Sequence, residues 1–333
     1  MDELIYSTLS QFSLVILLCI FVISLVTLSK GADILVDEAV SLSIHWGVPK
    51  MIIGATIVSL GTTLPEATVS VFAAINGNPD LALGNAIGSI IADTGLIIGI
   101  AALIGTLPID KNTINRQGRI QLLAGVLLAF VSLPFLSKGP HGVITQWTGL
   151  IFIALLIFYI FMLINGTRKS NEALAMDLEE EKNSVFLQII KLSLGVVMVI
   201  ASSKILIPTV GVTAARVGIP QSVIAATLVA FGTSLPELVT AITSVRKGHG
   251  ELAVGNIIGA DILNVLFVVG SAAAVTRRGL IVPRNFYILQ IPTMLIVLIA
   301  FRIFAKNKKG VITKPQGLFL AGIYFIYLIL NFV

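Results

Sequence analysis

Charged residues are scarce in this chain, and their scarcity excludes an ordinary soluble domain. Only 12% of the 333 residues are Asp, Glu, Lys or Arg, whereas 56% are hydrophobic. A soluble globular protein carries about a quarter charged residues. Cysteine is scarcer still, because the single Cys19 rules out an intramolecular disulfide. The net charge of +5 is spread over the loops of so apolar a chain, so we expect no nucleic-acid partner.

Long polar segments are missing as well, with one exception. The apolar residues gather in stretches of about 20 residues or more, each long enough to cross roughly 30 Å of hydrocarbon. They predict ten transmembrane helices, at residues 11–38, 48–76, 80–105, 118–137, 146–165, 185–208, 219–246, 250–276, 284–304 and 315–332. The acidic N-terminus has no cleavage site after its apolar run, which predicts a retained first helix. The exception is "NGTRKSNEALAMDLEEEKNS", which we interpret as a linker between spans five and six.

The two halves of the sequence repeat one another at an offset of 171 residues, without a gap from about residue 47 to residue 99. The offset superimposes Gly61 on Gly232, Pro65 on Pro236, Glu66 on Glu237, Gly77 on Gly248, Asn85 on Asn256 and Gly88 on Gly259. Five spans per repeat place equivalent helices in opposite orientations. We therefore predict an all-α membrane protein whose ten transmembrane helices form two inverted five-helix repeats. Residues 1–165 form the first repeat, 166–184 a cytoplasmic linker and 185–333 the second repeat.

Lysine and arginine predict the orientation of the chain in the membrane. The loops after odd-numbered spans hold most of them: Lys50, Lys111, Arg116, Arg119, Arg168, Lys169, Lys182, Arg246, Lys247, Arg302, Lys306, Lys308, Lys309 and Lys314. The opposite side has Lys138, Arg216, Arg277, Arg278 and Arg284. Positive loops remain in the cytoplasm. We expect a multi-pass protein of the cell membrane with both termini outside.

Two matching segments, "GTTLPEATVS" at 61–70 and "GTSLPELVTA" at 232–241, place a proline and a glutamate inside an apolar span. Each proline leaves the carbonyl four residues earlier, that of Gly61 or Gly232, without its helical partner. Such a carbonyl is tolerated at membrane depth where another helix, water or an ion satisfies it. Each glutamate has hydroxyls one turn away: Thr62 and Thr63 for Glu66, Thr233 and Ser234 for Glu237. These all-oxygen sets suit a hard cation such as Ca²⁺ or Na⁺.

Spans three and eight carry further polar residues at a spacing of four. Asn85, Ser89 and Asp93 share one helical face, and the offset equates them with Asn256, Ala260 and Asn264. An acid inside the membrane costs about 2.5–3.5 kcal/mol on insertion scales, so Glu66, Glu237 and Asp93 are predicted to be functional. Asp261 stays open, because its repeat partner is Ile90.

Some of these features also have structural interpretations. The pairs Gly84/Gly88 and Gly255/Gly259 favour close helix packing. Asn85 and Asn256 follow a turn, so helix capping and interhelical hydrogen bonds remain alternatives to contact with an ion. An interhelical hydrogen bond is likewise the alternative for Asp93.

The words "GTTLPE" and "GTSLPE", followed by "GNAIGS" and "GNIIGA", resemble the two α-repeats of the cation/calcium exchanger superfamily, in its sodium/calcium exchanger branch. The resemblance covers both repeats and the ten-span layout. It implies that Glu66 and Glu237 bind Ca²⁺. It also implies that the calcium and sodium sites are lined by Thr62, Thr63, Thr233 and Ser234, by the backbone at Ser59 and Ala230, and by Ser89, Asp93 and Asn264.

The resemblance implies an antiporter that exchanges several Na⁺ for each Ca²⁺ at the bilayer midplane, by movement of spans one and six. Such a protein is not an enzyme, and it needs no cofactor beyond the transported Ca²⁺ and Na⁺ and no obligatory protein partner besides the lipid bilayer. Ala260 departs from the pattern, because it lacks the hydroxyl of one expected sodium ligand. A Ca²⁺/H⁺ exchanger, a K⁺-dependent Na⁺/Ca²⁺ exchanger and a cation channel remain alternatives. An intramembrane aspartyl protease would need a Gly-x-Gly-Asp word, which the sequence lacks.

Overall fold

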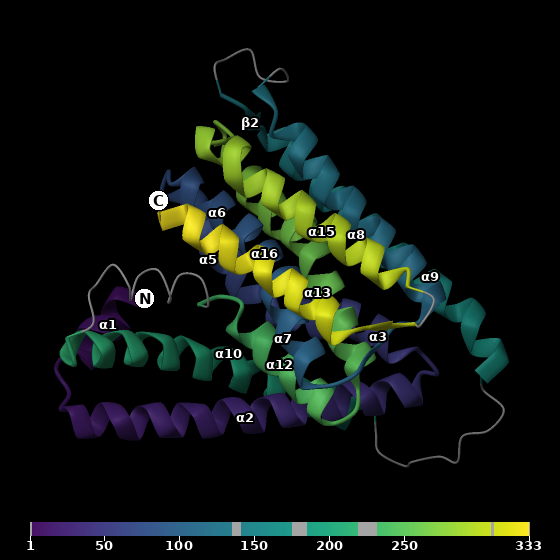
Figure 1. Ribbon diagram of the computed structural model, residues 1–333, viewed down its shortest axis with the longest axis horizontal. Coiled ribbons are helices and arrows are strands. Elements are labelled where there is room, and N and C mark those ends of the chain that lie inside the picture. Colours follow the sequence, from purple (N-terminus) through teal and green to yellow (C-terminus); the bar gives the residue numbers. More distant parts are fainter. Residues whose placement is uncertain (1, 135–140, 175–184, 219–231, 308–309, 333) are drawn as a thin grey trace.

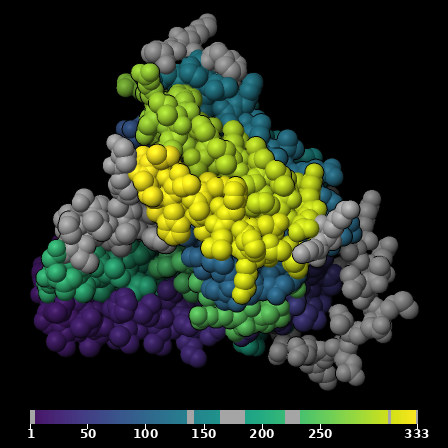
Figure 2. Space-filling model, in the orientation of Figure 1, coloured from purple at the N-terminus to yellow at the C-terminus, as the bar shows by residue number. Residues whose placement is uncertain are grey.

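The structure is a computed structural model that describes residues 2–134, 141–174, 185–218, 232–307 and 310–332. Most of these residues are helical. The long helices are α2 (Leu14–His45), α8 (Lys111–Val131), α9 (Gln146–Leu174), α10 (Val185–Arg216), α15 (Ile291–Ala305) and α16 (Lys314–Phe332), and a short α1 (Asp2–Leu9) precedes them. α2 and α10 lie side by side and cross the direction of the other long helices (Figure 1). Figure 2 shows these two helices as a separate layer along one side of the molecule.

The remaining spans are interrupted helices. One consists of α3 (Lys50–Ile53), η1 (Gly54–Val58), α4 (Ser59–Thr62) and α5 (Leu64–Ile75), where η denotes a π-helical segment. Another joins α6 (Pro79–Ile91), η2 (Ala92–Ile97) and α7 (Ile98–Ile104). In the second half, α12 (Leu235–Arg246) is followed by α13 (Gly250–Leu263), η4 (Asn264–Val269) and α14 (Gly270–Ala274), and η5 (Phe286–Gln290) leads into α15. Among the described residues, six helices are long and apolar enough to cross a membrane, and the pair bent by 45° between Thr62 and Leu64 would make a seventh.

The internal repeat of the sequence reappears in the bounds of the helices. α5 and α12 have 12 residues each and begin 171 residues apart, and the same offset separates the starts of α6 and α13. The turns between them also match, since Gly77 and Gly248 both have a positive φ, of 73° and 79°. Glycine occupies this left-handed conformation without the steric cost that other residues incur. Equivalent sequence words therefore fold into equivalent local structures.

Two short antiparallel strand pairs connect the halves. β1 (Leu107–Pro108) pairs with β4 (Val311–Ile312), and β2 (Val143–Ile144) pairs with β3 (Leu280–Ile281). Each pair joins a loop of the first half to a loop of the second half. β1 precedes α8 and β2 follows it, so the 21 residues of α8, about 32 Å of helix, separate the two pairs. The sequence did not predict these pairs, which tie the halves together at both ends of α8.

The core lies around α13. In the helix from Gly250 to Ala274, 94% of the most apolar window is buried, against 22% in the corresponding window of α2. Glycines let α13 approach the first interrupted span closely. A Cβ on Gly255 would lie 2.1 Å from the carbonyl oxygen of Met51, and one on Gly259 would lie 2.4 Å from Ser59 Oγ. The packing interpretation of Gly255 and Gly259 therefore agrees with the structure.

Several predicted boundaries differ from the observed ones. α9 continues to Leu174, nine residues into the predicted linker, because Arg, Lys, Glu, Ala and Leu in that segment all favour a helix outside the membrane. α10 extends to Arg216 through Pro208, and α8 begins at Lys111 rather than at residue 118. The start of predicted span seven, residues 219–231, lies outside the described residues. The close packing predicted for Gly88 is not observed, because a Cβ there would meet no atom within 4 Å.

Candidate cation-binding site

The two helix breaks place a glutamate at the same position in each half. Pro65 and Pro236 stand in the first turn of α5 and α12, and Glu66 and Glu237 follow them. Proline is favoured there because the first N–H groups of a helix need no partner within it. Each carboxylate then lies at the positive end of its helix dipole, which stabilises a negative charge. Both glutamates are buried, with 1% of their surface exposed.

Reciprocal hydrogen bonds connect the two halves at this position. The Thr62 hydroxyl donates to Asn256 Oδ1 over 3.4 Å, and the Thr233 hydroxyl donates to Asn85 Oδ1 over 3.0 Å. The offset of 171 residues converts one bond into the other. Asn85 Nδ2 also donates to the carbonyl of Glu66, over 3.1 Å. Asn85 and Asn256 therefore form hydrogen bonds between the halves, and their contact with an ion stays a prediction.

Two π-helical segments carry the remaining polar residues. Asp93 is the second residue of η2, and Asn264 is the first residue of η4; each is 1% exposed. In a π segment each backbone hydrogen bond spans five residues instead of four, which widens the helix, and such segments are frequent at functional sites. α5 packs against η4 and α12 packs against η2. Each glutamate helix therefore contacts the π segment of the other half.

Many oxygen atoms in this region are buried and have no hydrogen-bond donor among the described atoms. They are Thr63 Oγ1, Glu66 Oε1 and Oε2, Asp93 Oδ1, Glu237 Oε2, Asp261 Oδ1 and Asn264 Oδ1. Buried acceptors in proteins are nearly always paired, and leaving a charged one unpaired is costly. All seven accept hydrogen bonds or bind cations when the acids are ionised. The chemistry of the set matches that of a cation site.

The four acids act on one another through their charges when they are ionised. Asp93 acts on Glu66, Glu66 acts on Glu237, and both Glu237 and Asp261 act on Asp93. Hydroxyls lie between the acids: Thr62 and Thr63 are next to the Glu237 carboxylate, Thr233 is next to Glu66 and Ser234 is next to Asp93. Within the described ranges, no three His, Cys, Asp or Glu side chains come together as a metal cluster. A cation here would therefore combine carboxylates with hydroxyl, amide and carbonyl oxygens.

The structure thus brings together most of the residues that the sequence predicted. Ser59, Thr62 and Thr63 are buried at the break of the first half. Ser89 in α6 contacts Thr233 of the second half, with 3.5 Å between their hydroxyl oxygens. Ser234, Glu237 and Asn264 complete the set from the second half. Ala230 lies outside the described residues.

Two polar residues beside the site were missed. Thr94 and Gln121 both donate to Asp261 Oδ2, and the bond from Gln121 Nε2 is 2.6 Å long. A signal for Gln121 exists in the sequence, because Thr113, Gln117 and Gln121 recur every four residues and so share one face of α8. All three are buried.

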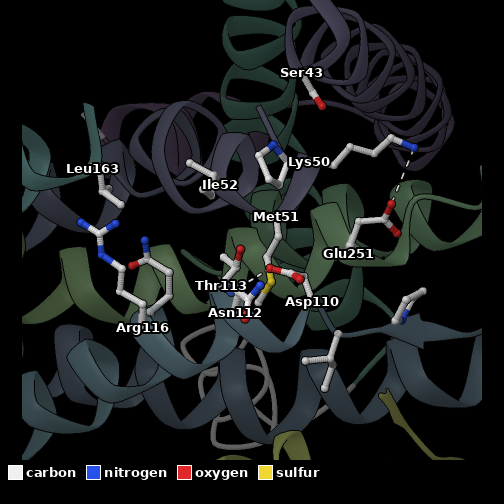
Figure 3. Close-up of a pocket in the computed structure, with 14 residues that line it drawn as sticks. Ser43, Lys50, Met51, Ile52, Asp110, Asn112, Thr113, Arg116, Leu163 and Glu251 are labelled. Carbon is white, nitrogen blue, oxygen red and sulfur yellow. Dashed lines mark hydrogen bonds and ion pairs between the residues drawn. The ribbon is translucent and has the colours of Figure 1, made fainter. Parts of the chain in front are cut away.

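A separate cavity of about 860 Å³ lies beside the beginnings of α3, α8 and α13 (Figure 3). Lys50 and Glu251 form an ion pair of 3.6 Å on one side of it, and Arg116 and Leu163 lie on the other. Asp110 and Thr113 line it too, and the Asp110 carboxylate caps α8 by accepting from the Thr113 N–H over 2.7 Å. None of the four buried acids lines this cavity. It is therefore distinct from the candidate cation site.

The mostly helical chain and its several apolar spans make this a multi-pass membrane protein. The chain belongs to the sodium/calcium exchanger protein family, whose sequence pattern matches residues 16–165 and 187–333. The members of this family are transporters, and the chain is therefore a cation/calcium exchanger.

Individual relatives agree with this assignment. The inner membrane protein YrbG of Escherichia coli is 33% identical over 314 residues, which cover 93% of this chain and 94% of the relative. The sodium/calcium exchanger MaX1 of Methanosarcina acetivorans is 29% identical over 282 residues, 75% of this chain and 81% of the relative. The solved structure of the sodium–calcium exchanger NCX_Mj soaked with Na⁺ and Sr²⁺ superimposes with a TM-score of 0.79. It is 26% identical, over 95% of this chain and 99% of that one.

Proposed function

We propose that the protein exchanges Na⁺ for Ca²⁺ across the cell membrane, with Glu66 and Glu237 as the principal Ca²⁺ ligands. The observation that carries this proposal is the set of buried oxygens without donors around these two carboxylates. Ca²⁺ takes six to eight oxygen ligands, including carboxylates, carbonyls and amide oxygens. Thr62, Thr63, Thr233 and Ser234, together with the backbone at Ser59 and at Ala230, complete the sites. Ser89, Asp93 and Asn264 contribute from the neighbouring helices.

The proposed exchange is coupled by charge. An empty group of carboxylates is too costly to carry through an occluded, low-dielectric state, whereas a group neutralised by cations can pass through it. Ca²⁺ and Na⁺ would bind at overlapping positions near the bilayer midplane, where many transporters bind their ions at a repeat interface. Because the two ions compete for the same oxygens, each is released on the side where the other binds.

Alternating access would come from α2 and α10 moving together against the remaining helices. These two helices form one unit: a Cβ on Gly195 would lie 2.8 Å from the backbone nitrogen of Leu35, and Lys191 pairs with Glu38 at 3.4 Å. A described connection between this unit and the rest is Lys247, which precedes α13. Its ammonium lies 2.8 Å from Asp37 and 3.3 Å from Asp33, both on α2.

The proposed topology has ten spans in two inverted repeats, with residues 1–165 and 185–333 as the repeats and with both termini outside. The reciprocal bonds Thr62–Asn256 and Thr233–Asn85 support the symmetry between the halves. Single cysteines test the orientation in a Cys19→Ser background. We expect Lys314→Cys to react with an impermeant reagent only from the cytoplasm and Arg278→Cys only from outside. Labelling of Lys314→Cys from outside in intact cells would reverse the orientation.

The function is tested by uptake of ⁴⁵Ca²⁺ into proteoliposomes that contain the purified protein. Gradients of Na⁺, K⁺ and H⁺ are imposed one at a time, and a permeant anion at equal concentration on both sides keeps the membrane potential near zero in every arm. We expect uptake to follow an outward Na⁺ gradient and to need neither K⁺ nor a pH difference. Uptake driven by the pH difference alone would establish a Ca²⁺/H⁺ exchanger, and an absolute need for K⁺ would establish the K⁺-dependent type. A channel would give Ca²⁺ flux without counter-transport.

A further inference from the structure

Asp261 is a buried acid that neither the repeat symmetry nor the proposed ion ligands account for. It lies in α13 and is 2% exposed. One of its oxygens, Oδ2, accepts hydrogen bonds from the Thr94 hydroxyl and from Gln121 Nε2, the latter over 2.6 Å. Gln121 Nε2 also lies 3.3 Å from Thr94 Oγ1. The three side chains therefore form a closed triangle of hydrogen bonds, which we name the Asp261 cluster.

The Asp261 cluster joins three helices at one point. Thr94 follows Asp93 in η2, Asp261 lies three residues before Asn264 on α13, and Gln121 lies on α8. A single carboxylate thus connects the two segments that present Asp93 and Asn264 and attaches both of them to a third helix. A buried network rigidifies its surroundings when its donors are satisfied.

The cluster is absent from the equivalent position in the other half. The offset of 171 residues equates Asp261 with Ile90 and Thr94 with Val265, both of which are described and apolar. Pseudo-symmetry therefore does not require this acid. The pair of polar residues that it adjoins is also unsymmetrical, because Asp93 is an acid and its equivalent Asn264 is an amide. The extra contacts occur where the charges of the two halves differ.

We propose that Asp261 is a positioning residue: it binds Thr94 and Gln121 and thereby fixes the spacing between Asp93 and Asn264, on which the cation affinity of their shared site depends. This inference rests on the proposed function, because it assumes that Asp93 and Asn264 contact the transported ions. The competing role is that of a direct cation ligand, for which Asp261 Oδ1, without a donor among the described atoms, would be available. A direct ligand needs the negative charge of residue 261, whereas a positioning residue needs only an oxygen that accepts the two hydrogen bonds.

Asparagine and leucine substitutions separate these roles. Asp261→Asn removes the charge but keeps an oxygen that accepts from Thr94 and Gln121. A positioning role predicts that its half-saturating Ca²⁺ and Na⁺ concentrations stay within about threefold of wild type, since the two donors keep their acceptor. Asp261→Leu removes the acceptor and should raise both values by on the order of tenfold or more, because two buried donors lose their partner.

Gln121→Leu tests the same contact from the opposite side, and Gln117→Leu is its matched control. Both glutamines are buried on one face of α8, one turn apart, but Gln117 accepts from the Tyr159 hydroxyl over 2.9 Å instead of binding Asp261. We expect Gln121→Leu to raise the half-saturating Ca²⁺ concentration by on the order of tenfold while the maximal rate changes little. Gln117→Leu should lower the melting temperature and leave the ion dependence unchanged.

The experiment measures ⁴⁵Ca²⁺ uptake against Ca²⁺ and Na⁺ concentration, together with the Ca²⁺-induced shift of the melting temperature in detergent. Loss of transport in Asp261→Asn, with loss of the Ca²⁺-induced shift, would overturn the proposal and make Asp261 a ligand. Equal effects of Gln121→Leu and Gln117→Leu on ion dependence would overturn it too, and reduce the cluster to packing. If wild type itself shows neither Na⁺-driven uptake nor a Ca²⁺-induced shift, the proposed function fails before the variants are compared.

Discussion

The close contact between α13 and the first interrupted span can be tested at Gly259. A Cβ at this position would lie 2.4 Å from Ser59 Oγ and 2.6 Å from both the Cα and the carbonyl oxygen of Ala55. Two of these three atoms belong to the backbone, so rotation of a side chain cannot relieve the overlap. To regain an ordinary separation, the two helices would have to move apart by roughly 1 Å in a closely packed interior.

Gly259→Ala should therefore lower the free energy of unfolding by about 1–3 kcal/mol, the usual cost of overpacking a core. Because Ser59 lies at this contact and is a proposed ligand, we also expect a higher half-saturating Ca²⁺ concentration. Gly322→Ala in α16 is the matched control, since a Cβ there meets no atom within 4 Å. Alanine is preferred to glycine in a helix by about 1 kcal/mol, so the control should be as stable as wild type or more stable.

The assay compares melting temperatures of the purified variants in detergent with their ⁴⁵Ca²⁺ uptake in proteoliposomes. We expect the melting temperature of Gly259→Ala to fall and that of Gly322→Ala to rise or stay unchanged. The close contact at Gly259 would be refuted if Gly259→Ala melted at the wild-type temperature and transported Ca²⁺ with unchanged half-saturation. That result would mean that α13 does not pack closely against η1 and α4 at Gly259.

Two further variants test the charges. Asp93→Asn should change the Na⁺ and Ca²⁺ dependence of uptake, and the exchanged pair Asp93→Asn with Asn264→Asp should recover part of the transport because it restores the total charge; unchanged ion dependence with a lower melting temperature would make Asp93 a packing residue. Burial lowers the pKa of Lys247, but hydrogen bonds and charge interactions with Asp37 and Asp33 outweigh it and raise the pKa above its ordinary value. A raised pKa stabilises the folded state below the unfolded pKa, and this stabilisation is lost as the pH rises through the folded pKa. Wild type should therefore melt above Lys247→Gln by a constant amount through neutral pH and should lose this advantage only in strong alkali. The difference should be small, under about 1 kcal/mol, because the pair is partly exposed and screened; a difference that vanishes near pH 7 would contradict the pairing.

Local sequence signals predicted the features that depend on local chemistry. Proline inside an apolar span predicts a break, and the structure places a 45° bend immediately before Pro65. The repeat offset predicted equivalent turns, which Gly77 and Gly248 form. Such features need only the few residues around them, so one sequence is sufficient.

Features that depend on distant contacts were not predictable in the same way. The partner of Asp261 is Gln121, and the contact depends on which face of α8 meets α13. The π segments around Asp93 and Asn264 have no composition that distinguishes them from α-helix. The pairing of β1 with β4 involves only two residues in each strand, too few for an alternating pattern. The extension of α9 to Leu174 was hidden by its polar composition, which reads equally well as linker or solvated helix.

The central claim, that Glu66 and Glu237 together bind the transported Ca²⁺, is tested most directly by Ca²⁺ uptake in Glu66→Gln and Glu237→Gln. Glutamine keeps the shape of each side chain but removes half of the charge that the two carboxylates offer a divalent ion. Glu251→Gln is the control, because Glu251 pairs with Lys50 at the surface of α13. We predict that both site variants remain folded and lose Na⁺-driven ⁴⁵Ca²⁺ uptake, whereas the control transports normally. Uptake near the wild-type level in either Glu66→Gln or Glu237→Gln would contradict the account.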